Sequence, residues 1–408
     1  MAAGFRFFPG KAGVGMLISE KVKQAIEILR EIKIDCWITF VRESEINRDS
    51  VLPFLLNSEV TWPSAIIVTA GGETCAIVGE YDRQTVEDLR VYNQVTGYVQ
   101  SYRKEIQDYL RRLNPAKIAL NYSRSSEICD GLTHGMFLTM REILAEIGLE
   151  ERIVSAERVI SPLRERKTAA EIASIKQAIA VTEEIFAKTA RFIRPGVSEK
   201  EIAVLMKDEV KKRGLRLAWQ EGSCPSVFTG PQTAGAHYAP SDRKVAAGHL
   251  VNIDFGVKVN GYCSDMQRTF YVLTEEEKEP PGEVLHGFET IAAAIELTKK
   301  AMRPGVIGQD IDKLARNHLA EQGYDEFPHG LGHQVGRFVH DGAALLGPPW
   351  EKYGRKVFQK LEAGMVFTIE PRLTVPGKGI VSVEEMVLIG ENGSEYLTHP
   401  QKQLHLIS

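Results

Sequence analysis

The second half of the chain contains acidic residues whose types and spacing suit metal binding. Asp254 and Asp265 lie in one alternating apolar stretch. Glu370 lies in a second such stretch, and Glu384 and Glu385 follow on the strand that returns from it. Carboxylate oxygens are the ligands that hard divalent ions prefer. These residues could therefore hold a metal centre, provided that the fold brings them together.

A histidine-containing segment lies between the two acidic pairs. HGLGHQVGRFVHD, residues 329–341, contains His329, His333 and His340 in a chain with ten histidines. His329 and His333 have the i, i+4 spacing of a helical zinc pair, but the glycines between them favour a loop. A single loop histidine is usually a surface residue, whereas three in one short segment indicate a role in metal binding or proton transfer.

The first acidic pair is predicted to lie on a β-hairpin. HLVNIDFGVKVNGYCSDMQRTFYVL alternates like two strands around Asn260-Gly261, a preferred two-residue turn. Pairing outward from this turn places Asp254 opposite Gln267, with Asp265 as a diagonal neighbour on the same face. Diagonal positions are about 7 to 8 Å apart, which suits two ions about 3.5 to 4 Å from each other. A pair of solvated surface carboxylates is the alternative.

Glu370 has two possible partners on the returning strand. In GIVSVEEMVLIG, Ser382 and Glu384 lie on the more polar face, and Glu385 lies on the other. Matching the polar face to that of Glu370 selects Glu384. A simple hairpin that pairs Val375 with Ile380 would instead select Glu385.

Choosing Glu384 therefore requires one extra residue in the ladder. Pro371, which cannot donate a ladder hydrogen bond, is the candidate for a bulge. Four carboxylates and one imidazole carry four negative charges, which two divalent ions would offset. Burying the cluster without metal would force several acids to bind protons.

The elements that position these residues fall into two regions. From about Ile18 to Ala156, apolar strand-like runs (IDCWITFV, SAIIVTA, TCAIVG, KIALNYS) alternate with helical patterns (EKVKQAIEILREI, TMREILAEIG). This alternation predicts an α/β domain with a central sheet. Beyond it, Thr168 with Glu171 and Ser198 with Glu201 form capping-box patterns that predict two helix starts.

A weak internal repeat follows. FIRPGVSEKEIAVLMKDEVKKRG (192–214) resembles AMRPGVIGQDIDKLARNHLAEQG (301–323), and an acid-bearing strand pair follows each copy. Two amphipathic helices can resemble each other by chance. The matching acids, Asp254 and Glu370, favour two copies whose acidic residues face each other.

Length and composition predict an ordinary two-domain globular protein. The 408 residues are 43% hydrophobic and 25% charged, and one core rarely organises so long a chain. A net charge of −4 and a pI near 6.3 disfavour nucleic acid and anionic membranes as partners. The N-terminus MAAGFRFFPGKAGVGML lacks the apolar core of a signal peptide, so the expected location is cytoplasmic.

The five cysteines are odd in number, scattered and without C-x-x-C spacing. They predict neither a disulfide framework nor a zinc knuckle and fit a reducing cytosol. Cys263, close to Asp265, is expected to be a small strand residue rather than a nucleophile.

From about Leu163 to Leu397 the chain resembles the metallopeptidases of pita-bread fold, which include aminopeptidase P, prolidase and methionine aminopeptidase. The segments that carry the resemblance are IDFGVKVNGYCSDMQRTF, HGLGHQVGRFVHD, FTIEP and VEEMVLI. The resemblance implies an α/β N-terminal domain with a central mixed sheet over residues 1–160, as in creatinases and prolidases. It implies an α+β pita-bread catalytic domain with an internal pseudo-twofold repeat over residues 161–408.

The same resemblance implies a dinuclear metal site in which Glu384, rather than Glu385, is the last ligand. The five implied ligands are Asp254, Asp265, His333, Glu370 and Glu384. Two divalent ions would activate a water for attack on a peptide carbonyl. Mn²⁺ is expected first, with Co²⁺, Zn²⁺ or Fe²⁺ as alternatives.

Further residues match the family's catalytic and substrate positions. His237 in GAHYAP and His340 correspond to histidines that contact substrate and help to transfer protons. Glu370 would accept the proton of the water and pass it to the departing amine. His329 is expected on the substrate side.

Two residues depart from the Xaa-Pro peptidases of the family. Ser382 stands where these often carry arginine, and Arg372 follows Pro371 where they usually have glycine. Arg372 could replace the missing cation or be a surface strand residue. Both positions lie where substrate is shaped, so they bear on specificity rather than on metal binding.

The expected function is cleavage of the Xaa-Pro bond at the N-terminus of peptides or in dipeptides, as in aminopeptidase P or prolidase. The alternative is a C–N hydrolase of the same fold that acts on a small non-peptide substrate, like ectoine hydrolase or creatinase. A peptide-binding module without catalysis is disfavoured because all five ligands are present. A homodimer is expected, with Trp37 and Trp62 as possible contact residues and core packing as the main expectation for each.

Overall fold

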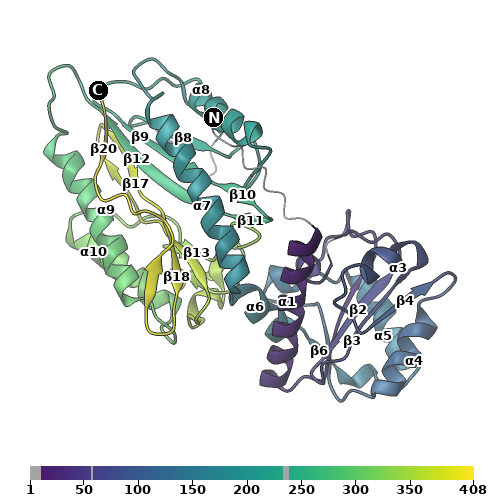
Figure 1. The fold of residues 1–408 in the computed structure, drawn as a ribbon. Helices are drawn as coiled ribbons and strands as arrows, with labels where there is room; N and C mark the ends of the chain where they lie inside the picture. The colour runs from purple at the N-terminus through teal and green to yellow at the C-terminus, as the bar shows by residue number, and fades with distance from the viewer. Residues whose placement is uncertain (1–10, 57, 233–238) are drawn as a thin grey trace. The chain divides into compact units, whose positions relative to one another are not determined.

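The computed structural model describes residues 11–56, 58–232 and 239–408, and the chain divides into two compact units at Arg164 and Glu165 (Figure 1). The boundary expected between residues 160 and 161 falls within helix α6 (Glu157–Glu165). Each unit has a sheet and a core of its own.

The N-terminal unit is built on a six-stranded mixed sheet of order β4-β3-β2-β1-β5-β6. The strands are β1 Cys36–Val41, β2 Ser64–Thr69, β3 Thr74–Gly79, β4 Gln94–Tyr98, β5 Ile118–Leu120 and β6 Ile153–Ser155. Strand β2 is antiparallel to β1 and β3, whereas β4, β5 and β6 pair in parallel with their neighbours. The predicted mixed sheet is confirmed. Strands β1 to β3 are buried along their whole length, which explains their continuous apolar sequences.

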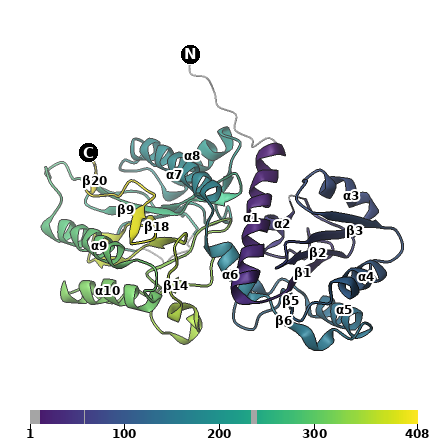
Figure 2. The same cartoon turned by 60° about the horizontal axis from the view of Figure 1, so that its bottom comes forward.

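Helices cover both faces of this sheet, with α1 on one face and α4 and α5 on the other (Figures 1 and 2). The helices of the unit are α1 Lys11–Ile32, α2 Leu52–Leu55, α3 Glu80–Glu87, α4 Arg103–Leu113 and α5 His134–Ala145, followed by α6. Leu110 and Ile143, from α4 and α5, pack with Ile38 of β1 in one core. Trp37 is buried, as expected, and donates from Nε1 to Asn121 Oδ1 at 2.6 Å.

The C-terminal unit places its strands between two helix pairs, α7 with α8 and α9 with α10 (Figure 2). These helices are α7 Ala169–Ala190, α8 Glu199–Lys212, α9 Gly282–Ala301 and α10 Gly308–Glu321. The first strands are β7 Arg216–Leu217, β8 Ser226–Thr229, β9 Leu250–Phe255, β10 Val257–Val259, β11 Tyr262–Cys263 and β12 Met266–Val272. The later ones are β13 Gly332–His333, β14 Leu345–Leu346, β15 Val366–Ile369, β16 Arg372–Val375, β17 Gly379–Ser382, β18 Glu385–Ile389, β19 Ser394–Tyr396 and β20 His405–Ile407.

The strands of this unit form several small sheets. Strands β20-β12-β9-β8 form one, β15-β18-β19 another, and β16 pairs with β17. Strands β11-β10-β7 and β13-β14 form two more. Short 3₁₀ segments of the chain are Glu127–Cys129, Glu150–Arg152, Glu351–Tyr353 and Lys356–Phe358.

The internal repeat is present in the backbone. The glycine that follows each Arg-Pro, Gly196 and Gly305, has a φ of 88°. Gly196 N–H donates to Val245 O at 2.9 Å, and Gly305 N–H donates to Leu361 O at 2.8 Å. Each glycine therefore ties the start of one helix to the strand region of its own copy.

The predicted capping boxes are confirmed at the starts of α7 and α8. Thr168 accepts from Glu171 N and Ser198 accepts from Glu201 N, and each glutamate side chain accepts from the backbone N–H of its capping residue. Among the described helices, none combines the length and the apolarity that a bilayer crossing requires.

Candidate metal centre

The hairpin of β9 and β12 forms as predicted. Asn260 and Gly261 have φ values of 51° and 83°, which the turn type requires. Gln267 pairs with Asp254, and Asp265 directly precedes β12. Asp254, Asp265 and Gln267 all line one cavity, so the shared face deduced from the alternation is confirmed.

The second hairpin has a register different from the expected one. Val375 pairs with Gly379, not with Ile380, because a three-residue turn closes with a bond from Lys378 N–H to Val375 O at 3.0 Å. The same register continues through Arg372 with Ser382 and on to Ile369 with Glu385.

No bulge is needed to bring Glu384 into position. Two residues lie between the paired segments on each strand, so Glu370 falls opposite Glu384 with Pro371 in the gap. The prediction of one extra residue in the ladder at Pro371 is therefore wrong. Glu384 lines the cavity with Glu370, and Glu385 lies on the opposite face, in agreement with the polar-face argument.

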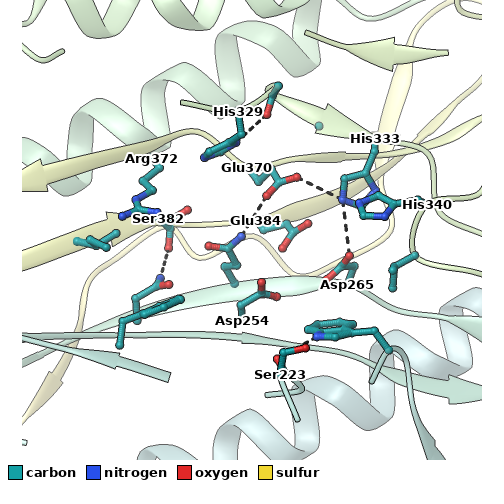
Figure 3. Close-up of a pocket in the computed structure, with 18 of the residues that line it drawn as sticks. Ser223, Asp254, Asp265, His329, His333, His340, Glu370, Arg372, Ser382 and Glu384 are labelled. Carbon is teal, nitrogen blue, oxygen red and sulfur yellow. Dashed lines mark hydrogen bonds and ion pairs between the residues drawn. The ribbon is translucent and has the colours of Figure 1, made fainter. Parts of the chain in front are cut away.

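Hydrogen bonds join the two hairpins across the cavity floor. Gln267 Nε2 donates to Glu370 Oε2 at 3.2 Å, and Glu384 N–H donates to Gln267 O at 3.1 Å. Asn252 Nδ2 donates to Ser382 O at 2.7 Å. The resulting cavity of about 470 Å³ contains all five predicted ligands (Figure 3).

The histidine segment is not helical, in agreement with the prediction. Most of it is loop, and Gly332 and His333 form the short strand β13, which pairs with β14. His333 belongs to β13, and its Nε2 lies 3.3 Å from Glu370 Oε1 and 3.7 Å from Asp265 Oδ2. Its ring centroid lies 4.3 Å from that of His340. Asp265, His333 and Glu384 each place a ligand atom within 4.8 Å of the others. The fold therefore brings together residues that are far apart in the chain.

His329 also lines the cavity, with its Nδ1 at 2.8 Å from Gly330 O. Its loop is held by a buried ion pair that the sequence did not reveal. Arg316 Nε donates to Asp312 Oδ2 at 2.7 Å, and Arg316 Nη1 donates to Phe327 O at 2.8 Å. Asp312 Oδ1 accepts from Leu331 N at 3.0 Å. The i, i+4 spacing of these two residues on α10 was the available signal.

His237 lies within residues 233–238, outside the part of the chain that the structure describes. Cys263 is fully buried, and burial raises the pKa of its thiol to about 12. It is therefore a packed strand residue, as expected. All five cysteines are free and buried.

The acids of the cavity repel one another. Burial, followed by the charges of Asp265 and Glu370, raises the pKa of Asp254 well above its usual range. Burial, followed by the same two charges, does the same to the pKa of Glu384. Burial raises the pKa of Asp265 to about 7. Burial and like charge thus favour the protonated forms of Asp254 and Glu384 in the protein without metal.

Glu370 and His333 behave differently because they contact each other. Burial acts to raise the pKa of Glu370, but the hydrogen bond and charge of His333 outweigh it and leave the pKa lowered. Burial acts to lower the pKa of His333, and the hydrogen bond and charge of Glu370 raise it to about 9. The imidazole thus acts as a counter-ion when no metal is bound.

The donor set fits divalent cations. Asp254 Oδ1 and both carboxylate oxygens of Glu384 are buried without a hydrogen-bond partner among the described residues. Such groups are costly unless a cation or proton compensates them. Four carboxylates and an imidazole in one cavity offer mostly oxygen ligands, which suit hard or borderline divalent ions.

A second buried ion pair, also missed by the sequence reasoning, lies behind the cavity. Arg268 Nη1 lies 3.1 Å from Glu385 Oε1 and donates to the backbone oxygens of Gln267 and Glu384 at 2.9 and 3.0 Å. Glu385 therefore neutralises Arg268 instead of facing the metal site. The sequence did not indicate this role, because Glu385 lies next to Glu384 and both were candidate metal ligands.

Comparison with known proteins agrees with this geometry. Residues 173–391 match the model of metallopeptidase family M24. An uncharacterised peptidase of Staphylococcus haemolyticus is 31% identical over 341 residues, which cover 83% of this chain and 88% of the relative. An uncharacterised peptidase of Bacillus subtilis is 29% identical over 68% of this chain and 73% of its own.

Two solved structures share the fold over nearly their whole length. The X-Pro aminopeptidase of Thermotoga maritima is 26% identical with a TM-score of 0.69, covering 95% of this chain and 99% of that protein. The prolidase of Pyrococcus horikoshii is 25% identical with a TM-score of 0.67, covering 94% and 99%. The resemblance and the two-domain fold class stated from the sequence are confirmed. This chain belongs to metallopeptidase family M24.

Proposed function

We propose that this peptidase is a dinuclear metal-dependent hydrolase that cleaves the Xaa-Pro bond at the N-terminus of peptides or in dipeptides. The observation that carries this proposal is the cavity in which buried, unpartnered oxygens of Asp254 and Glu384 lie with the other three predicted ligands. The Xaa-Pro specificity is supported by the similar X-Pro aminopeptidase and prolidase structures.

The ligands of the two ions would be Asp254, Asp265, His333, Glu370 and Glu384. Bound divalent ions, Mn²⁺ foremost and Co²⁺, Zn²⁺ or Fe²⁺ as alternatives, would supply an acidified water and a positive charge for the carbonyl oxygen. Glu370 lines the same cavity, and bound cations would keep its carboxylate ionised. It can therefore accept a proton and release it to the departing amine.

Histidines and one arginine would handle the substrate. His340, packed edge-on against His333, lines the cavity and can donate an N–H to the oxygen that becomes negative during attack. His237 is proposed to share the proton transfer. His329 and Arg372 line the cavity and are proposed to contact the substrate.

A same-fold C–N hydrolase that acts on a small non-peptide substrate, as ectoine hydrolase and creatinase do, is the second candidate. One observation favours it: Ser382 and Arg372 change the wall of the cavity relative to the Xaa-Pro peptidases that the chain resembles. A panel of Xaa-Pro dipeptides, longer Xaa-Pro peptides and cyclic amidines, each assayed with Mn²⁺, separates the two candidates.

Replacing Asp265 with Ala tests the metal-dependent reaction. We expect the variant to lose at least 100-fold in kcat/KM on Xaa-Pro substrates, because it lacks a ligand placed within 4.8 Å of the other two donors. Chelation should abolish wild-type activity, and Mn²⁺ should restore it. Asp208, an exposed acid on α8, supplies the control: Asp208→Ala should keep full activity. Full activity after chelation would refute the proposal.

We also infer a cytoplasmic location and a homodimer. Five free, buried cysteines fit a reducing compartment. The N-terminal unit exposes large apolar side chains, including Trp62, Tyr81 and Val99 with 54%, 94% and 83% of their surface accessible. The prediction that Trp62 packs in the core is therefore wrong. Exposed apolar side chains of this kind often mark contacts between subunits.

A further inference from the structure

One cation lies in the wall of the metal cavity. Arg372 on β16 lies two residues beyond Glu370 and pairs with Ser382 on β17. Positions i and i+2 of a strand share a face, so Arg372 continues the cavity-facing row that Glu370 begins. Both Arg372 and Ser382 line the cavity, and Figure 3 shows them together on one side of it.

The guanidinium of Arg372 has no counter-ion among the described residues, whose ion pairs and side-chain hydrogen bonds do not involve it. Burial lowers its pKa, and no acidic residue offsets that effect. A guanidinium nevertheless stays charged in proteins. A partly buried, uncompensated cation at a cavity wall is therefore suited to an anionic ligand, and its fork geometry matches a carboxylate.

Ser382 provides the space for such a ligand. Directly opposed side chains of an antiparallel pair lie about 4.5 to 5.5 Å apart at Cβ, so a larger residue would fill the volume beside the guanidinium. The Ser382 hydroxyl donates to Pro371 O at 3.1 Å and stays within the hairpin. The cavity wall thus presents the charged Arg372 side chain next to the small Ser382 side chain.

The spacing between successive cavity-facing residue pairs of the hairpin limits the distance from the Arg372 guanidinium to the bond that is cleaved. Glu370 lies opposite Glu384, and the next cavity-facing row is Arg372 with Ser382. Two residues of strand separate these rows by about 6.6 Å. One amino-acid residue spans at most about 3.8 Å, and a hydrogen bond adds about 3 Å. A carboxylate one residue beyond the scissile carbonyl would therefore reach Arg372.

We propose that Arg372 binds the free C-terminal carboxylate of the residue that follows the scissile bond, and that the enzyme is consequently a dipeptidase. This inference rests on the proposed function and deepens it. A longer peptide would place a neutral amide at Arg372 and leave the guanidinium without a negatively charged partner. Cavity residues Phe228 and Ile380 supply apolar surface for the ring of a proline in the same place.

The test compares three substrates on the Mn²⁺-loaded enzyme: an Xaa-Pro dipeptide, its C-terminal amide and an Xaa-Pro-Xaa tripeptide. For the wild type we expect kcat/KM on the dipeptide to exceed that on the other two by about 10- to 100-fold, the contribution of one charged hydrogen-bonded pair. Arg372→Gln should remove this preference, mainly by raising KM for the dipeptide. Arg372→Lys should retain part of the preference.

Lys378→Gln is the matched control because it removes a cation at the turn of the same hairpin and outside the cavity lining. It should keep the wild-type preference. Equal cleavage of the three substrates by the wild type would overturn the inference and leave the proposed function intact, as would an unchanged preference in Arg372→Gln. Failure to cleave any Xaa-Pro compound would overturn the proposed function and the inference with it. The wild-type comparison tests the dipeptide preference whether or not a variant folds, and Arg372→Lys tests the residue if Arg372→Gln does not fold.

Discussion

Single acidic residues in the cavity are costly to the protein when no cation is bound. Glu384 is 1% exposed, and neither of its carboxylate oxygens has a hydrogen-bond partner among the described residues. Burial and the neighbouring acids raise its pKa well above the usual 4.5. A group whose pKa is raised by folding contributes stability below its unfolded pKa and loses it as pH rises through the folded pKa.

Replacing Glu384 with Gln should therefore stabilise the metal-free protein as pH increases. The amide mimics the protonated acid, so metal-free Glu384→Gln and wild type should have similar Tm values near pH 4.5. At pH 8 the variant should melt several degrees higher. Saturating Mn²⁺ should reverse the order, because a ligand present at 100 times its Kd contributes about 2.7 kcal/mol to the protein that binds it.

Thermal unfolding in chelator and in Mn²⁺, from pH 4.5 to pH 8, checks this prediction. A Glu395→Gln variant, altered at an exposed position, should follow the wild type throughout. A metal-free Glu384→Gln variant that is less stable than the wild type at pH 8 would contradict the assignment of a strained, uncompensated acid.

At the scale of elements, the hairpin of β9 and β12 and the later strands β15 to β18 are held together by buried charge. Arg268, 5% exposed, pairs with Glu385 and donates to the backbone oxygens of Gln267 and Glu384. The arginine thereby fixes the strand positions from which two cavity residues project. Hydrogen bonds that orient ligands commonly alter metal affinity when they are removed.

Arg268→Met should weaken metal binding by about 10- to 100-fold, measured by calorimetry. It should also lower the free energy of unfolding by about 3 to 5 kcal/mol, because Glu385 is left buried and unpaired. The double variant with Glu385→Gln should recover much of the stability but not the metal affinity. Lys104→Met, which removes an exposed pair with Asp108, should change neither quantity.

The histidine loop lies against β15 at one position where only glycine fits. A Cβ at Gly332 would stand 2.0 Å from Thr368 O, so Gly332→Ala must displace the backbone next to His333. We expect a loss of about 1 to 3 kcal/mol in unfolding free energy and weaker metal binding. Gly282→Ala, where a Cβ would meet nothing within 4 Å, should match the wild type in chemical unfolding and calorimetry.

At the scale of the whole molecule, the N-terminal unit presents an apolar surface at the ends of β3 and β4. Gly79 pairs with Tyr98. Trp62 packs against Gly79, and Tyr81 and Val99 lie within two residues of this pair in the sequence. Strand β4 is an edge of the sheet, and an exposed edge with apolar neighbours favours association.

Light scattering should accordingly give a mass near 90.8 kDa, twice the 45.4 kDa of one chain. Replacing Tyr81 and Val99 with Glu should shift the protein toward the monomer. Leu406→Glu, at a 45% exposed residue of the C-terminal unit, should leave the mass unchanged. A wild-type monomer at micromolar concentration would contradict the proposed dimer.

Short-range sequence rules determined much of the fold. The alternation around Asn260-Gly261 predicted that Asp254 would pair with Gln267, and the capping residues Thr168 and Ser198 marked the starts of α7 and α8. These features depend on contacts between residues close in the chain. Helices α3 and α4 and strand β4 were missed because α3 and α4 are rich in charged residues and β4 is only partly buried. In α4, the buried residues Ile106, Tyr109 and Leu110 recur at helical spacing, a signal that could have found this helix.

Identifying the site required both the sequence and the tertiary structure. The sequence by itself named the acids and histidines and, through the family resemblance, the order Asp254, Asp265, His333, Glu370 and Glu384. Only the tertiary structure decided that a three-residue turn, rather than a bulge, places Glu384 opposite Glu370. The tertiary structure was also needed to show that Glu385 pairs with Arg268 and that Arg372 has no counter-ion among the described residues. Both findings depend on burial and on contacts between residues distant in the chain, which local sequence patterns do not encode.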